Sequence, residues 1–513
     1  MRVASARRLT RLMRSASAAT QRAGCVVVLC AQCVLTACGG GDVGVSPTST
    51  PPTALAPTPT PARAPTPAST QTAAPAPGAA QSIDDGASGD PVGLRVLRGA
   101  NGDAFAVWRA HDGTRHNLWA NRYRAAAAAW SNALSIETSA ADIFTFDLTV
   151  DPRGNAVVVW NESAPGGTMV MSVRFDSGAG LWSAPQPLSE PRDVTRPRVA
   201  SDATGAVLAV WGTGAEGRFF DPVSGAWQPL DAIEDSTFGT GDSNSPVPIL
   251  DGSGNALVVF RNERVGAGIL ASNYFSRSTG SWGRLPPEVV DIFGAVPGSF
   301  VLGFTDSIHL AAAGGGDFLA AWQSLAVFDD AQQSLIRIAR FTSRTRTWST
   351  AETVLTASLD DESFRLQRLA SDAAGNAQLI WTQRDGTRTA LKAMRIDGAV
   401  CSAAEVLDRA IGGGAASADL GVDAQGNAIA IWQQFEGGRP DDGSRSNIAI
   451  NRFDAATGLW SGAAFAETQA GNAISPGASA GGGQMLLGWI QSQGGVNRVK
   501  ALVQPLAAAE ARQ

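Results

Sequence analysis

Short runs of apolar residues end on an aromatic residue about every 50 residues along most of the chain. The clearest copies read DPRGNAVVVW, DAAGNAQLIW and DAQGNAIAIW. Short runs of this kind, bounded by turn residues, predict β-strands. The aromatic residue that ends each run, called the anchor below, occurs eight times: Trp108, Trp160, Trp211, Phe260, Trp322, Trp381, Trp432 and Trp489.

A turn signature precedes every anchor. A glycine stands six residues before each of the eight, and an aspartate stands nine residues before five of them, as in Asp151 and Gly154. Asp first and Gly fourth are typical of a type I turn that closes through a left-handed residue, which glycine adopts without steric cost. Each copy is therefore predicted to hold a β-hairpin, with strand a before the Asp and strand b ending on the anchor.

A second signature follows each anchor. Five copies place Tyr123, Phe175, Phe275, Ile396 or Gln504 fifteen residues after the anchor. Segments such as RFDSGAGLW and RFDAATGLW then predict a second tight turn, between strands c and d. In six copies a Trp ends this segment, seven residues after an aromatic residue of strand c, as in Trp130 and Trp182. Thirteen of the 14 tryptophans are either anchors or occupy this second position, so we interpret them as core layers. Cys401 lies in the Trp region of the sixth copy and is expected to pack as a small core residue.

Four short strands per copy, in eight copies, predict an all-β fold: a β-propeller of about eight four-stranded blades. A superhelical array of hairpins is the alternative. The segment FDPVSGAW resembles the Kelch repeat, in which an aromatic-Asp-Pro run precedes a Trp at this spacing. The Kelch Gly-Gly pair is replaced here by the anchor. The resemblance therefore implies the propeller fold and assigns no functional residue.

The two ends of the chain are predicted to meet. The last copy stops after strand c, and the segment Ala80-Gln81-Ser82-Ile83-Asp84 is similar to the d-strand tail that precedes other copies. We expect this N-terminal segment to supply the missing d strand and to close the ring, which removes exposed sheet edges.

The N-terminus has the layout of a secretory signal peptide: a basic segment, an apolar run too short to span a bilayer, and small residues. Leu35-Thr36-Ala37-Cys38-Gly39 resembles the lipobox of bacterial lipoproteins, which implies acylation of Cys38 and a membrane anchor. Gly39, where an Asp would signal inner-membrane retention, implies the outer membrane. An ordinary signal peptide is the alternative. The predicted domains are a signal peptide (1–37), a Pro/Thr/Ala-rich linker (38–80) and the propeller (81–513).

Charge excludes one class of partner. Six arginines lie in the first 22 residues, and the rest of the chain holds 34 basic against 46 acidic residues, a charge of about −12. Such a body repels phosphate backbones, so nucleic acid is not an expected partner. We expect a monomer in the cell envelope, periplasmic or surface-facing, that meets a protein or a glycan.

The connections between strands b and c and between blades vary in length and share one face of the propeller, called the loop face below, and we expect the binding site there. Candidate chemistry on this face is sparse, and His111, His116, Asp329, Asp330, Asp441 and Asp442 are its candidate binding residues. His111 and His116 share one loop, but without a third ligand they are a weak metal signal. Asp329, Asp330, Asp441 and Asp442 fall in variable connections and are expected to be solvated, with a Ca²⁺ site or a glycosidase carboxylate pair as alternatives. No catalytic residue and no cofactor are assigned. The sequence thus favours a non-catalytic binding scaffold, with a polysaccharide hydrolase or lyase as the alternative.

Overall fold

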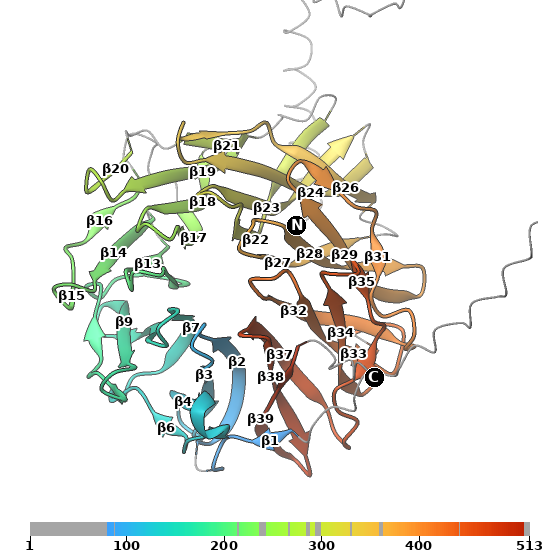
Figure 1. The fold of residues 1–513 in the computed structure, drawn as a ribbon, viewed down its shortest axis with the longest axis horizontal. Coiled ribbons are helices and arrows are strands. Elements are labelled where there is room, and N and C mark those ends of the chain that lie inside the picture. The colour runs from blue at the N-terminus through green and yellow to red at the C-terminus, as the bar shows by residue number, and fades with distance from the viewer. Residues whose placement is uncertain are drawn as a thin grey trace, which may run out of the picture. The chain divides into compact units, whose positions relative to one another are not determined.

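The computed structural model describes residues 80–506, except 87, 213–214, 235–242, 265–266, 284–287, 293–298, 329–330, 359–362 and 441. These residues form eight antiparallel sheets arranged around one axis, so the predicted β-propeller is confirmed (Figure 1). The predicted signal peptide, Cys38 and the linker before residue 80 lie outside the described residues.

Each blade runs from an inner strand a to an outer strand d. Blades 1 to 4 contain β2 (Asp90–Arg98) to β6 (Leu134–Ser135), β7 (Ile143–Val150) to β11 (Gln186–Pro187), β12 (Arg198–Ser201) to β16 (Asp231–Ala232), and β17 (Ser243–Leu250) to β21 (Glu288–Ile292). Blades 5 to 8 contain β22 (Ser299–Ala312) to β26 (Glu352–Ser358), β27 (Phe364–Ser371) to β31 (Glu405–Val406), β32 (Gly414–Val422) to β36 (Ala464–Phe465), and β37 (Ala473–Gly481) to β39 (Val496–Pro505).

Strand d departs from the prediction of one continuous strand. In seven blades it consists of two short pieces that both pair with strand c; in blade 1 these are β5 (Ala129–Trp130) and β6, which pair with β4 (His116–Arg124). Between the two pieces the chain makes no strand pairing with strand c. Each of these blades is therefore a sheet of four strands whose outer strand is interrupted.

The predicted a–b turns are present with the expected hydrogen bonds. In blade 2, Gly154 donates its N–H to the carbonyl oxygen of Asp151 (3.0 Å) and has φ +84°. The Asp151 carboxylate accepts the N–H groups of Arg153 and Asn155 (2.9 Å each). Asp and Gly are therefore both required by the turn, as the spacing indicates.

The repeated aromatic residues form the predicted core layers. Seven tryptophan anchors and Phe260 are at most 1% exposed. The second aromatic residue of strand c lies directly opposite the Trp of strand d in six blades, with ring centroids 5.3–5.6 Å apart. Cys401 faces Ile396 at the same position and packs against the core.

The ring closes as predicted. β1 (Gln81–Ser82) pairs antiparallel with β39, with Gln81 opposite Ala501 and Ser82 opposite Lys500 (Figure 1). Ile83 then donates its N–H to the carbonyl of Val499 (3.0 Å), as Ile136 does to Leu118 in blade 1. The side chain of Ile83 is 4% exposed. The N-terminal segment is therefore the outer strand of blade 8.

The inner strands contact one another in the order β2, β7, β12, β17, β22, β27, β32 and β37, and back to β2. Among the residues that the structure describes, no helix is long and apolar enough to cross a membrane.

Candidate functional site at the propeller axis

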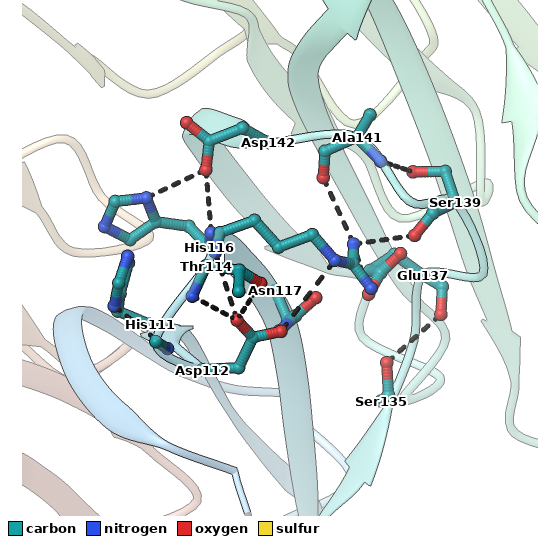
Figure 2. Close-up of polar contacts among 12 residues, drawn as sticks. His111, Asp112, Thr114, His116, Asn117, Ser135, Glu137, Ser139, Ala141 and Asp142 are labelled. Carbon is teal, nitrogen blue, oxygen red and sulfur yellow. Dashed lines mark hydrogen bonds and ion pairs between the residues drawn. The ribbon is translucent and has the colours of Figure 1, made fainter.

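The structure brings His111 and His116 together at the tip of the β3–β4 hairpin of blade 1, where β3 is Ala104–His111. Their ring centroids lie 4.9 Å apart. The His116 imidazole reaches Asp142 (Nδ1 to Oδ1, 3.0 Å), as Figure 2 shows. A carboxylate only accepts hydrogen bonds, so His116 carries its proton on Nδ1. His111 Nδ1 accepts the N–H of Gly113 (3.1 Å), which leaves the proton on Nε2.

The residues around His111 and His116 are joined by a network of polar contacts, and together they form what is called the loop cluster here. Hydrogen bonds from Thr114 and Asn117 hold the pKa of Asp112 well below its ordinary value. Arg115 bonds the carbonyls of Ser139 (2.7 Å) and Ala141 (3.1 Å) and lies 3.6 Å from Glu137. These contacts join the hairpin to the connection between blades 1 and 2 (Figure 2). The cluster holds two blades together.

Of the four predicted acidic positions, the structure describes only Asp442. Asp329, Asp330 and Asp441 lie outside the described residues. Asp442 lies in blade 7, in the connection between β33 (Ala428–Phe435) and β34 (Ser446–Asp454). Its carboxylate accepts the N–H groups of Arg439 (3.1 Å) and Ser444 (2.9 Å). Hydrogen bonds from Ser444 lower the pKa of Asp442. Within the described ranges, no group of three or more His, Cys, Asp and Glu side chains is arranged to hold a metal ion.

A different set of residues gathers at the axis of the propeller. On each inner strand, one residue lies opposite the strand b residue that precedes the anchor, so these eight residues share one level of the ring. This axial ring consists of Arg95, Asp147, Arg198, Val247, His309, Arg368, Asp419 and Gly477. Six of the eight members are titratable, whereas the next residue of each strand is apolar in every blade, as in Leu148 and Leu369.

Two arginines of the axial ring are each held by an aspartate of the next blade. Arg95 lies 3.9 Å from Asp147 of the next blade, which accepts the N–H of Val199 in the blade after that (3.1 Å). Arg368 lies 3.4 Å from Asp419, which accepts the N–H of Ala478 (3.0 Å). Each aspartate therefore fixes one guanidinium and links three consecutive blades.

His309 and Arg198 complete the titratable part of the axial ring. Burial, reinforced by the positive charges of Arg368, Arg198 and Arg95, lowers the pKa of His309 to about 3. Arg95 and His309 lie on blades 1 and 5, opposite one another in a ring of eight, and the charge of Arg95 still lowers the pKa of His309, so both side chains project toward the axis. Burial also lowers the pKa of Arg198.

The axial ring has an excess of one positive charge. Three arginines stand against two aspartates, and a pKa of about 3 leaves His309 neutral near pH 7. Asp147 attracts both Arg198 and Arg95, while burial, together with the repelling positive charges of Arg95 and Arg368, lowers the pKa of Arg198. An arginine fork in this environment is suited to a planar anion such as a carboxylate.

The sequence contains a signal for the axial ring. In most blades a polar residue followed by an apolar one stands four residues before the first position of the a–b turn, as Asp147 does before Asp151. The predictions rested on strand b, strand c and the loops, and so missed it. They also missed a ring of buried acids at the end of strand d, each directly after an apolar residue: Asp84, Glu137, Glu234, Asp291, Asp408 and Glu467. Arginines pair with several of these acids, as Arg498 does with Asp84 (3.5 Å). We therefore interpret these acids as structural ion-pair partners that stabilise the fold.

No family model matches the chain, and no curated protein matches it. Solved structures that share the fold include the polysaccharide lyase Uly1 (10% identity over 74% of this chain and 92% of that one, TM-score 0.43). A PL25 ulvan lyase matches at 10% identity over 82% and 95% (TM-score 0.42). An α-L-arabinanase from Penicillium chrysogenum matches at 12% over 71% and 93% (TM-score 0.36).

These structures overturn one prediction. The sequence favours a protein that is not an enzyme, yet the propellers that this chain resembles include polysaccharide lyases and an α-L-arabinanase. The prediction treated an absence of familiar catalytic motifs in the loops as an absence of chemistry, whereas the titratable groups lie on the inner strands. At these identities the likeness concerns the fold alone, so function has to be argued from this chain's own residues.

Proposed function

We propose that this protein is an envelope enzyme that cleaves an acidic polysaccharide at the propeller axis by β-elimination. One observation carries the proposal: Arg95, Arg198 and Arg368 surround a neutral His309 on the inner strands. Elimination from a uronate needs a cation that neutralises the carboxylate and a base that removes the neighbouring proton. The axial ring offers both chemical groups within one ring of side chains.

Arg198 is the proposed carboxylate ligand. Arg95 and Arg368 are each engaged by an aspartate. Arg198 is attracted by Asp147, but that aspartate is already paired with Arg95. A bound uronate carboxylate would supply the missing negative charge, and its attraction to a half-buried guanidinium is stronger than in water. Arg95 and Arg368 contribute to the potential that favours the anion.

His309 is the proposed base. Its low pKa keeps the imidazole unprotonated, and a bound carboxylate cancels part of the arginine potential, which raises the proton affinity of the ring. His309 takes the proton from the carbon that bears the carboxylate. That electron pair forms a carbon–carbon double bond as the bond from the neighbouring carbon to the glycosidic oxygen breaks. The leaving oxygen takes the proton from the imidazolium, which restores the neutral base.

Hydrolysis is less well supported by the same residues. A glycosidase needs one protonated carboxyl and one free carboxylate. Asp147 and Asp419 are each already engaged by an arginine and by a backbone N–H that they accept. Neither aspartate is placed to donate a proton.

The lipobox-like segment supports an envelope location. We propose that Cys38 anchors the protein to the outer membrane and that the Pro-rich linker separates the propeller from the bilayer. At about 3.1 Å per residue, the Pro-rich part of the linker, residues 47–77, reaches roughly 100 Å at full extension. The partner is then an envelope or environmental glycan, and the axial chemistry requires no cofactor.

The test is to incubate the protein separately with alginate, pectate and hyaluronan, with dextran as a neutral control. Elimination produces a new double bond that absorbs ultraviolet light, and at least one uronate polymer should yield it. Arg198→Met and His309→Gln should abolish the signal, whereas Lys392→Met, which removes a positive charge on strand c of blade 6, should not. New reducing ends without ultraviolet absorbance would mean hydrolysis. No cleavage of any uronate polymer would contradict the proposal.

A further inference from the structure

A left-handed residue recurs on the inner strands or, in blade 3, just before the inner strand, close to the axial ring. In blades 1, 3, 4, 7 and 8 it stands two residues before the axial residue. The residues are Gly93, Arg196, Ser245, Ser417 and Ser475, with φ between +48° and +68°. The strand pairing slips at four of them, between Val92 and Leu94 in blade 1 for example. We call the four non-glycine residues the collar.

The collar conformation is unfavourable for the residues that adopt it. A left-handed backbone costs an L-residue with a side chain about 1–2 kcal/mol relative to glycine. Most of the outer c–d turns use glycine for such positions, as in Gly180, Gly225, Gly280 and Gly458, while blades 1 and 5 have Ala128 and Arg346 there. The collar instead keeps one arginine and three serines. Because conformation alone would favour glycine, we infer that the side chains have a separate use.

The collar lies between the axial ring and the loop face. Each inner strand runs from the connection between blades toward the a–b turn, so residues before the axial position are nearer the loops. Arg196 donates to the hydroxyl of Ser245 (3.1 Å) and joins blades 3 and 4. Ser417 is exposed and Ser475 half-buried. Within the described part of the chain, neither of these two hydroxyls makes a hydrogen bond.

We propose that the collar is a subsite for the hydroxyl groups of the sugar units that flank the uronate held at the axis. This inference rests on the proposed function and adds the direction of entry: the glycan arrives from the loop face and passes the collar before its charged unit reaches Arg198. Serine hydroxyls both donate and accept hydrogen bonds, which suits sugar hydroxyls. The strained backbone holds them in place before the ligand binds.

The test separates strain from recognition. Ser417→Gly and Ser475→Gly relieve the left-handed backbone, so each should raise stability in urea unfolding. Each should also weaken binding of a short oligogalacturonate roughly three- to tenfold, the loss of one or two hydrogen bonds. Binding of galacturonate monomer, which needs Arg198 alone, should not change. Ala128→Gly is the matched control: Ala128 is left-handed (φ +48°) in the outer c–d turn of blade 1, so stability should rise without any change in binding.

The outcomes distinguish the two proposals. Monomer binding that Arg198→Met abolishes, together with unchanged oligomer affinity in both serine variants, would overturn the collar and leave the axial site intact. Failure of wild-type protein to bind either the monomer or the oligomer would contradict the proposed function and the collar together.

Discussion

At the residue scale, Gly205 and Gly375 occupy the same turn position in blades 3 and 6 but have different surroundings. Both are left-handed, with φ of +87° and +89°. A Cβ on Gly205 would meet no atom closer than 3.5 Å, whereas on Gly375 it would lie 2.2 Å from the backbone carbon of Ala313. The two positions therefore share backbone strain and differ in space.

Gly205→Ala should lower the free energy of unfolding by about 1–2 kcal/mol, the cost of a left-handed alanine. Gly375→Ala should lose a further 1–3 kcal/mol, roughly, because the backbone of blade 5 has to move. Urea titration of the two variants measures the difference. Equal losses would show that blades 5 and 6 do not pack as closely as described.

Asp408 gives a pH-dependent prediction. Burial raises the pKa of this carboxyl, and the charge of Arg388 only partly offsets the effect. A raised folded-state pKa means that the folded chain holds the proton to higher pH than the unfolded chain. The contribution of Asp408 is therefore most favourable in acid and is lost as pH rises above the ordinary aspartate pKa of about 4.

Asp408→Asn should remove that loss. The stability of the variant, followed by thermal unfolding from mildly acidic to neutral pH, should fall less steeply with pH than that of the wild type. Asp397→Asn, which changes a half-exposed carboxyl in the same blade, is the matched control for the loss of one acidic group, and the Asp408 variant should have the shallower slope of the two. A steeper slope in the Asp408 variant would contradict the assignment of a raised pKa.

At the scale of elements, β1 is a two-residue strand on which the closure of the ring depends. Without it the outer edge of β39 is unpaired, Ile83 leaves a core that also contains Val499, and Asn121 loses the Ile83 carbonyl that it donates to (2.7 Å). Exposing an isoleucine alone costs about 1.5–3 kcal/mol.

A chain that begins at Gly86 should therefore unfold at lower temperature and aggregate more readily than one that begins at Gly78. Register gives a direct check. The pair Gln81→Cys and Ala501→Cys should form a disulfide within one molecule, while Gln81→Cys with Leu502→Cys should not, because neighbouring strand residues point to opposite faces. Equal stability of both chains, with no disulfide, would mean that the ring stays open.

Much of this architecture was predictable because the repeat makes each element appear eight times. The turn geometry of Asp151 and Gly154, the c–d aromatic pairs and the role of Ile83 all follow from spacing. The split of strand d did not, since short pieces such as β6 carry no hydrophobic period of their own. The axial ring was also missed: Arg95 and His309 are ordinary strand residues until the ring brings opposite blades together.

The indole N–H of a buried anchor tryptophan finds its partner two residues further along the same strand in some blades and not in others. Trp160 and Trp432 donate their indole N–H to Glu162 and Gln434, two residues further along strand b (2.6 Å each). In blade 1 that position is Ala110, and the indole nitrogen of Trp108 has no partner among the described residues. The sequence predicts the burial of the anchors, while their polar partners become apparent only when the blades are superposed by position.

At the scale of the whole molecule, anchoring should depend on one thiol. Replacing Cys38, which lies outside the described residues, should release the protein into the soluble periplasmic fraction or block its processing. Fractionation of cells expressing Cys38→Ala beside the wild type measures this. Ordinary membrane retention of the variant would contradict the lipoprotein proposal without affecting the axial site.

The central claim is that the axis, not the loop face, binds the acidic glycan. The chain holds three histidines: His309 at the axis and His111 and His116 on the loop of blade 1. Histidine ring resonances in an NMR titration therefore report the two locations separately, with His309→Gln used for assignment. Oligogalacturonate should shift the His309 signal and leave the other two unchanged, and a neutral oligosaccharide should shift none. A shift of His111 and His116 with His309 unmoved would contradict the claim and place binding on the loop face.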